Sequence, residues 1–233
     1  MRMCEIFFGF FLCLYLISAH TENELVTVIK AEYDITYRGI LIGKTTEIFE
    51  RTNQIYKISS TTQPKGIANF FLKKIEREAT GKITPTGLQP EFFIEKRQQR
   101  KQRTAEFNWG AKKLKIEAGK AVTHLEINSD NAVDQASFFW LFNFRALNHE
   151  NELEITDGKR IKTYTYVIQG QEILSSRIGK INTVIVEKTA VHSDKRRVKI
   201  WLAPDHFFLP VKMVFADKKG RIFISNISQL EAE

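Results

Sequence analysis

Residues 25–51 read LVTVIKAEYDITYRGILIGKTTEIFER, and this stretch decides the fold class. Every second residue of its first half lies on one face of an extended strand, and that face is largely apolar or aromatic: Leu25, Thr27, Ile29, Ala31, Tyr33, Ile35 and Tyr37. Alternation with a period of two is typical of a half-buried β-strand. The pair Arg38-Gly39 interrupts the pattern, which resumes from residue 40 to residue 51. The stretch therefore predicts two long strands joined by a turn.

The same alternation continues along most of the chain, with glycines between the segments. We expect further strands at 55–62, 75–84, 91–98, 103–109, 112–118, 121–127, 162–168, 182–189, 197–203, 208–216 and 222–225. The connections between these segments are short, which favours hairpins over βαβ crossovers. Neighbouring strands should therefore pair in an antiparallel meander.

The period of the pattern changes after residue 131. Asp134 is a suitable helix N-cap, and Phe138, Leu141 and Phe142 follow it at helical spacing. We expect a helix at 132–147, apolar over much of its circumference and therefore buried or packed against an apolar surface. The sequence thus predicts a mainly β fold: a large antiparallel meander curled into an open barrel, with one main α-helix covering or plugging it.

The first 19 residues have the layout of a secretory signal peptide. Arg2 precedes an uncharged apolar run at residues 6–17, and the small residues Ser18 and Ala19 follow it. The run is too short to span a bilayer comfortably, since a transmembrane helix takes about 20 apolar residues. We expect cleavage after Ala19 and a single periplasmic domain of residues 20–233. The alternative is an uncleaved membrane anchor.

The composition excludes some classes of site and favours others. Both cysteines, Cys4 and Cys13, lie in the signal segment, so the mature chain would hold neither a disulfide framework nor a thiolate nucleophile. The histidines show no metal-ligand spacing, and we expect no cofactor and no metal. The net charge of +8 favours anionic partners. In the periplasm these are lipid headgroups, lipopolysaccharide phosphates or acidic polymers, whereas nucleic acid is not expected.

A set of segments in a fixed order resembles a known family. The segments are YDITYRGILIG (33–43), PKGIANFF (64–71), TPTGLQP (84–90), FNW (107–109), DQAS (134–137) and WLAPDHFFLPV (201–211). Together they resemble the proteobacterial domain-of-unknown-function family 3108 over roughly residues 28–230. The resemblance implies an exported protein with a mostly β fold, and it carries no assigned activity.

No constellation of residues predicts catalysis. A nucleophile elbow of the Gly-x-Ser-x-Gly type is absent from the sequence. The pair Asp205-His206 could act as an acid and a base. The alternative is a hairpin turn between strands 197–203 and 208–216, in which Pro and Asp are common. We favour the turn and predict that the protein is not an enzyme.

Two groups of residues are candidates for ligand binding. The basic run 96–103 could bind phosphates, or it could be the solvated tip of a hairpin; its candidates are Lys96, Arg97, Arg100 and Lys101. The aromatic candidates, which could equally belong to the core, are Phe70, Phe71, Phe138, Trp140 and Phe142. Residues 67–72 are apolar without strict alternation and predict a short helix or lip at a rim.

These residues support two hypotheses of function. In the first, the protein is a non-enzymatic module that binds a lipid or another amphipathic component of the cell envelope. In the second, it is a structural or interaction protein with a fully packed core and a protein partner in the envelope. A void of several hundred Å³ lined by Phe and Ile would favour the first hypothesis, and a closed core would favour the second.

Overall fold

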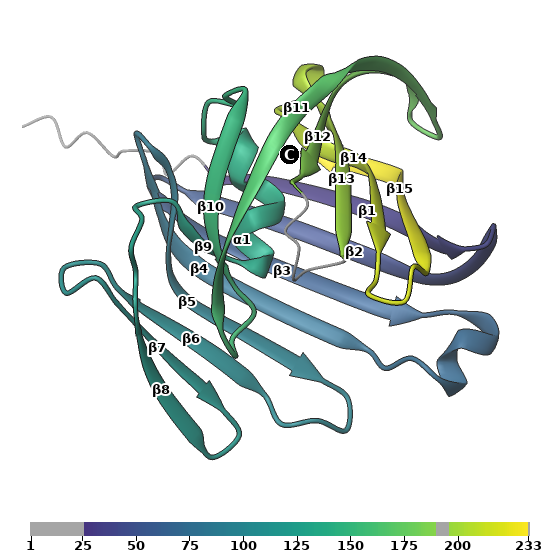
Figure 1. Cartoon of the computed structure of the whole chain (residues 1–233). Helices are drawn as coiled ribbons and strands as arrows, with labels where there is room; N and C mark the ends of the chain where they lie inside the picture. Colours follow the sequence, from purple (N-terminus) through teal and green to yellow (C-terminus); the bar gives the residue numbers. More distant parts are fainter. Residues whose placement is uncertain (1–25, 190–195, 233) are drawn as a thin grey trace, which may run out of the picture.

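The computed structural model describes residues 26–189 and 196–232, so the predicted signal peptide lies outside the described residues. Within these described residues, fifteen strands form one sheet in the order β8-β7-β6-β5-β4-β3-β2-β1-β15-β14-β13-β12-β11-β10-β9 (Figure 1). The strands are β1 (Val26–Tyr37), β2 (Ile40–Thr52), β3 (Ile55–Pro64), β4 (Ile75–Thr84), β5 (Gly87–Arg97), β6 (Arg103–Asn108), β7 (Lys113–Ala118), β8 (Ala121–Glu126), β9 (Ala132–Asp134), β10 (Glu150–Thr156), β11 (Ile161–Ser176), β12 (Gly179–Lys188), β13 (Arg197–Ala203), β14 (Leu209–Ala216) and β15 (Ile222–Ala232). The helical segments are α1 (Gln135–Trp140) and the 3-10 turns η1 (Gly66–Phe70), η2 (Leu141–Asn143) and η3 (Pro204–His206).

The order of the strands forces the sheet to roll up. Strands β8 and β9 follow each other in the chain but lie at opposite edges of the sheet. Residues 127–131 join them, and a connection of this length reaches at most about 20 Å. The two edges must therefore approach each other, and Figure 1 shows the sheet curved around α1. We call the space that the sheet encloses the hollow. In the described part of the chain β8 and β9 are not hydrogen-bonded neighbours, so the predicted open barrel with a helix in it is confirmed.

The connections between neighbouring strands are mostly tight hairpins, as the sequence predicts. Tyr37 lies opposite Ile40 across the first turn. Both turn residues have positive φ, 51° at Arg38 and 77° at Gly39. Positive φ at both central residues is the type I′ geometry, which matches the twist of the flanking strands. Strand β1 also pairs with β15, which joins the two halves of the chain in one sheet.

The helix is shorter than the sequence predicts, and the expected span 132–147 is wrong at both ends. Ala132–Asp134 form β9, whose backbone pairs in parallel with Glu154–Thr156 of β10. Asp134 caps α1 as expected, because its side chain accepts hydrogen bonds from two amides of the first turn. The chain then tightens into η2, so the helical segment ends at Asn143. In residues 26–189 and 196–232, none of the helices has the length and apolar character that crossing a bilayer requires.

Beyond β9, several strands differ from expectation. Strand β15 runs to Ala232, past the predicted end at residue 225. Strand β10 occupies residues 150–156, where the sequence predicts no strand. Strand β11 runs to Ser176, well past the predicted end at residue 168, and a bulge between Ile168 and Gly170 bends it. The β11–β12 hairpin thereby reaches β1, where Arg177 Nη1 lies 2.8 Å from Asp34 Oδ2.

Helix α1 lies in the hollow and packs its aromatic side chains on the inner face of the sheet. Trp140 is fully buried, and its ring centroid lies 5.1 Å from that of Phe49 on β2. The hydroxyls of Tyr56 on β3 and Ser137 on α1 are 2.9 Å apart and hydrogen-bonded. These contacts fix the helix to β2 and β3, so that it plugs the hollow.

The connections between antiparallel strands alternate between the two ends of the sheet. Those between β1 and β2, β3 and β4, β5 and β6, β7 and β8, β10 and β11, and β14 and β15 lie at one end, which we call the rim end. It comprises residues 38–39, 65–74, 98–102, 119–120, 157–160 and 217–221. The connections between β2 and β3, β4 and β5, and β6 and β7 lie at the opposite end.

Candidate functional site

A row of polar side chains crosses the inner face of the sheet from β2 to β6. We call it the polar ladder, and it consists of Glu47, Ser60, Arg77, Glu95 and Arg103. Each of these residues lies directly opposite the next in the register of the sheet. Side chains alternate between the two faces of a strand, so a single register line places all five on the same face.

The neighbouring row on the side of α1 is entirely apolar. It consists of Phe49, Ile58, Ala79, Phe93 and Ala105, all buried and paired in the same register. The inner face therefore has two layers: an apolar layer covered by α1, and the polar ladder next to it on the side of the rim end.

Glu95 is the charged centre of the ladder. Arg77 Nε donates a hydrogen bond of 2.9 Å to one carboxylate oxygen, and Arg97 Nε donates one of 2.8 Å to the other. Arg103 Nη1 lies 3.5 Å from the carboxylate. Burial raises the pKa of Glu95, but the hydrogen bond from Arg97 and the charge of Arg77 outweigh burial and hold the pKa below its ordinary value. The ladder thus holds an ionised carboxylate among three guanidinium groups.

Glu47 is the exception within the ladder. It is 5% exposed, and its Oε1 accepts a hydrogen bond of 2.6 Å from Ser60 Oγ. Its Oε2 has no hydrogen-bond partner among the described residues. Burial raises the pKa of Glu47 to about 7, and the hydrogen bond from Ser60 and the charge of Arg77 offset burial only in part. Near neutral pH the carboxyl is therefore poised between its two protonation states.

A central cavity of about 400 Å³ lies between the ladder and α1. One wall is apolar and is formed by Phe138 and Phe139 of α1 and by residues of β13, β14 and β15: Val198, Met213, Val214, Phe215 and Phe223. The other wall contains the ladder residues Glu47, Ser60 and Arg77 together with Tyr33, Ile35, Thr45 and Thr62. Volumes of roughly 300–1,000 Å³ with apolar walls and a few polar groups are typical of small-ligand sites.

A second cavity, of about 280 Å³, continues the first toward the rim end. The two share the lining residues Ile35 and Thr62. Phe71 and Leu72 of the β3–β4 connection line the second cavity, and so do Arg97 and Arg100. Together the cavities form a path from the polar ladder to the rim end, with apolar side chains on its walls and cations at its outer part.

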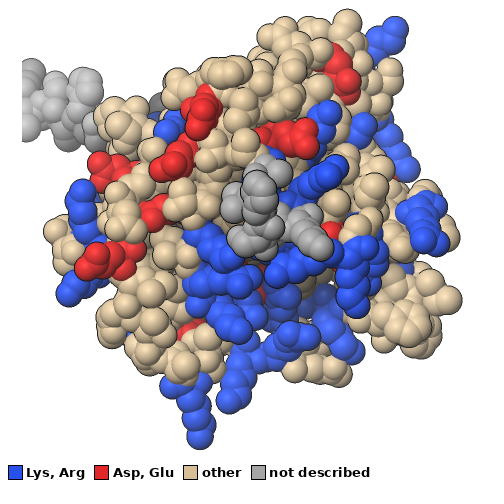
Figure 2. All heavy atoms as spheres, in the orientation of Figure 1, with Lys and Arg blue, Asp and Glu red and all other residues tan. Residues whose placement is uncertain are grey.

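Lysine and arginine side chains dominate the surface around this opening. Figure 2 shows them gathered across the hollow between the β3–β6 and β13–β15 parts of the sheet, where Asp and Glu are few. The rim connection 98–102 belongs to the predicted hairpin between β5 and β6, which the register confirms. Because the basic side chains surround the mouth of a cavity, an anionic group would be attracted to it.

The structure brings some of the predicted ligand-binding residues together and separates others. Phe71, Arg97 and Arg100 line the second cavity, and Phe138 lines the central cavity. The remaining candidates lie elsewhere: Phe70 is exposed on the rim, Trp140 and Phe142 are buried in the core, Lys96 is exposed and pairs with Glu78, and Lys101 is exposed on the β5–β6 turn. Binding by any of these residues stays a prediction.

The sequence reasoning missed the ladder residues Glu47, Ser60, Arg77 and Glu95, and it placed Arg103 only within the basic run 96–103. One signal was available for Glu47. Along β2 the inward positions alternate with outward ones, and Glu47 stands two residues before Phe49 at an inward position. An acid at an inward position of an amphipathic strand breaks the expected apolar pattern of that face, and this break is visible in the sequence.

The candidates for acid–base catalysis and for metal binding have no special environment in the described structure. Asp205 and His206 lie in η3, which connects the antiparallel strands β13 and β14, so the predicted turn is confirmed. Asp205 accepts a hydrogen bond of 3.3 Å from Asn182 at the surface. Within the described ranges, no group of three or more His, Cys, Asp or Glu side chains could hold a metal ion.

One solved structure with a similar fold supports the architecture, and others align more weakly. The β-barrel-like protein of the domain-of-unknown-function family DUF1849 from Brucella abortus aligns with a TM-score of 0.60 at 13% identity, over 90% of this chain and 99% of that chain. The MucA/MucB complex of Pseudomonas aeruginosa aligns with a TM-score of 0.28 at 12% identity, over 88% of this chain and 52% of that chain. A LolA superfamily protein from Nitrosomonas europaea aligns with a TM-score of 0.21 at 8% identity, over 90% of this chain and 86% of that chain. The first likeness concerns the fold alone, and the other two are too weak to carry an argument.

Sequence comparison identifies the family. No curated protein matches this chain. The sequence model of the family described as protein of unknown function DUF3108 matches residues 32–225, which covers most of the chain and agrees with the resemblance of the ordered segments. The chain therefore belongs to the DUF3108 family.

Proposed function

We propose that the protein is a non-enzymatic binding module whose two joined cavities hold a lipid or another amphipathic component of the cell envelope. The observation that carries the proposal is the central cavity of about 400 Å³ between α1 and the polar ladder. A structural protein with a fully packed core has no need of such a void, since protein interiors are normally close-packed. The cavity therefore favours the binding module over the scaffold.

The chemistry of the walls indicates the class of ligand. The aromatic side chains Phe138 and Phe139 offer an apolar surface to an alkyl chain. Arg97 and Arg100 offer donors to an anionic head at the outer part of the second cavity. An amphipathic anion satisfies both regions at once. The predicted signal peptide adds a periplasmic location to the proposal.

Displacement of a fluorescent fatty acid tests the proposal. We expect micromolar binding by the wild type. Replacement of Phe138 by Ser should weaken binding at every salt concentration, because apolar burial is not screened. Charge reversal of Arg100 should weaken binding mainly at low salt, because exposed charges are screened over about 8 Å at physiological ionic strength.

Reversal of Lys112 is the matched control, since Lys112 lies on the β6–β7 connection at the opposite end of the sheet. Its binding should equal that of the wild type. If the wild type binds no apolar probe at micromolar concentration, the binding-module hypothesis is wrong. The hypothesis of a structural or interaction protein is then favoured.

A further inference from the structure

The rim end carries large apolar side chains that are unusually exposed. On the β3–β4 connection, Ile67 is 72% exposed, and Phe70 and Phe71 are each 79% exposed. Ile40 is 64% exposed at the neighbouring start of β2, beside Leu41. Contiguous apolar patches of this kind on a folded protein mark sites of interaction. We call these five residues the apolar rim.

The local backbone holds the apolar rim outward. The amide of Lys65 donates a hydrogen bond of 2.9 Å to the carbonyl of Ile42, which ties the connection to β2 beside Ile40 and Leu41. The amides of Phe71 and Leu72 both donate to the carbonyl of Ala68, and the Ala68 side chain is buried. The connection is therefore anchored at its centre, and its large side chains point into solvent from a fixed turn.

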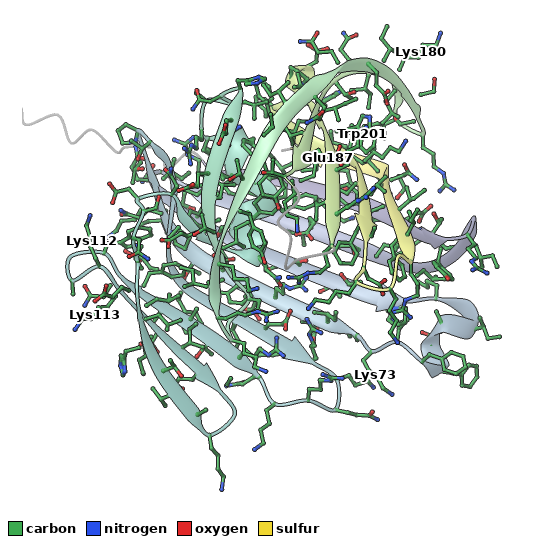
Figure 3. All side chains as sticks on the ribbon, viewed as in Figure 1. Lys73, Lys112, Lys113, Lys180, Glu187 and Trp201 are labelled. Carbon is green, nitrogen blue, oxygen red and sulfur yellow. The ribbon has the colours of Figure 1, made fainter. Side chains whose placement is uncertain are left out.

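The charge of the rim end is strongly one-sided. Its six connections among the described residues contain twelve cationic side chains: Arg38, Lys65, Lys73, Lys74, Arg100, Lys101, Lys120, Lys159, Arg160, Lys218, Lys219 and Arg221. They contain two acids: Asp217 pairs with Arg221 at 2.6 Å, and Asp157 lies 3.9 Å from Arg103. The connections 53–54, 85–86 and 109–112 at the opposite end carry one cation, Lys112. Figure 3 shows Lys73 across the molecule from Lys112 and Lys113.

We propose that the rim end docks on the surface of an anionic lipid bilayer, with the apolar rim inserted among the headgroups and the surrounding lysines and arginines facing them. Interfacial binding of this kind combines buried apolar area with attraction to anionic lipid. Each Lys or Arg near such a surface strengthens binding about fivefold. A protein partner fits the surface less well, because lysine is depleted from protein–protein interfaces.

Docking would also place the second cavity at the membrane. Phe71 and Leu72 line that cavity and belong to the β3–β4 connection. A ligand could then pass between the bilayer and the cavities without crossing water. The docking itself does not depend on a ligand, since Ile67 and Phe70 line neither cavity.

Co-sedimentation with vesicles tests the docking, and it uses the protein as it is purified from cells. One set of vesicles contains phosphatidylcholine alone, and the other contains phosphatidylcholine mixed with phosphatidylglycerol. The wild type should sediment with the mixed vesicles and much less with the neutral ones. The double variant Ile67→Ser/Phe70→Ser should bind the mixed vesicles about tenfold or more weakly. The double variant Lys73→Glu/Lys74→Glu should lose at least as much, and the loss should shrink at high salt.

Two controls match these variants in exposure and charge. Ile173→Ser removes an apolar side chain that is 69% exposed on β11, and Lys112→Glu/Lys113→Glu reverses two charges at the opposite end. Both should bind like the wild type. The variants change exposed side chains except at Lys74, which is half-buried and pairs with Glu76. Thermal unfolding equal to that of the wild type excludes misfolding as a cause for each variant.

The proposal is overturned if the wild type ignores the mixed vesicles, or if the rim variants bind them as well as the two controls do. If a photo-crosslinker at Phe70 captures a protein in cells while vesicles capture nothing, the rim end is a protein interface and the docking proposal is wrong. Fatty-acid displacement should be unchanged in Ile67→Ser/Phe70→Ser. Failure of the docking and failure of the cavity function are therefore distinguishable.

Discussion

Replacing Glu47 with Gln should stabilise the protein in a way that depends on pH. Burial raises the pKa of this carboxyl from 4.5 to about 7, which disfavours its ionised form in the folded state by about 3 kcal/mol. The folded state therefore favours the neutral carboxyl. The stabilisation that the neutral Glu47 carboxyl gives the folded state is complete below pH 4.5. It is lost as the pH rises toward 7. Gln cannot ionise and can still accept the hydrogen bond from Ser60.

The difference in unfolding free energy between Glu47→Gln and the wild type should therefore grow with pH. We expect it to be near zero around pH 4.5 and to reach about 2–3 kcal/mol at pH 8. Urea unfolding followed by tryptophan fluorescence measures the difference at each pH, and taking the difference cancels the titration of other groups.

Glu50→Gln is the matched control for this prediction. Glu50 lies on the same strand, its side chain is 45% exposed, and its ion pair with Lys57 is long at 3.9 Å. An exposed pair of this kind contributes roughly 0–1 kcal/mol, so the control should show little dependence on pH. A flat difference between Glu47→Gln and the wild type from pH 4.5 to pH 8 would refute the reasoning about the buried carboxyl.

Two other predictions concern the cap of helix α1 and the export of the protein to the periplasm. Asp134→Ala should cost about 2 kcal/mol in urea unfolding, because the first-turn amides of Ala136 and Ser137 lose their acceptor in a buried site. Asp134→Asn keeps an acceptor and should cost less than half as much; equal losses would contradict the cap. Residues 1–19 fused to a reporter that is active only in the periplasm should give signal, and a silent fusion would remove the export prediction.

The sequence predicts those parts of the fold that depend on neighbouring residues. The Arg38-Gly39 turn and the alternation on both sides of it specify a hairpin locally, and the structure has that hairpin. Strand β9 could not be predicted from neighbouring residues. It has only three residues, and its partner, Glu154–Thr156, follows about 20 residues later. A segment that short has no detectable period of its own. The sequence pattern therefore places its apolar residues in the predicted helix.

The polar ladder could not be predicted for a related reason. Each strand contributes a single polar residue at an inward position, which on its own looks like an imperfection in the alternation. The five residues become a line only when the register of four strand pairs is known. A shift of one residue in any pair would turn the side chains to the other face. The ligand-binding candidates taken from charge runs and Phe pairs missed the ladder because they were chosen by sequence neighbours.

The energetic cost of the ladder bears on its role. Replacing a buried ion pair with apolar residues of similar volume is often neutral or stabilising, so stability alone does not explain Glu95 and its three arginines. Glu47 adds a further cost, because its Oε2 is buried without a partner among the described residues. Both carboxyls lie on the inner face where the apolar layer ends, and Glu47 lines the central cavity. We infer that these costs are retained because the cavity must present polar groups at one wall while α1 presents apolar groups at the other. An amphipathic ligand needs both, whereas a scaffold with a packed core needs neither.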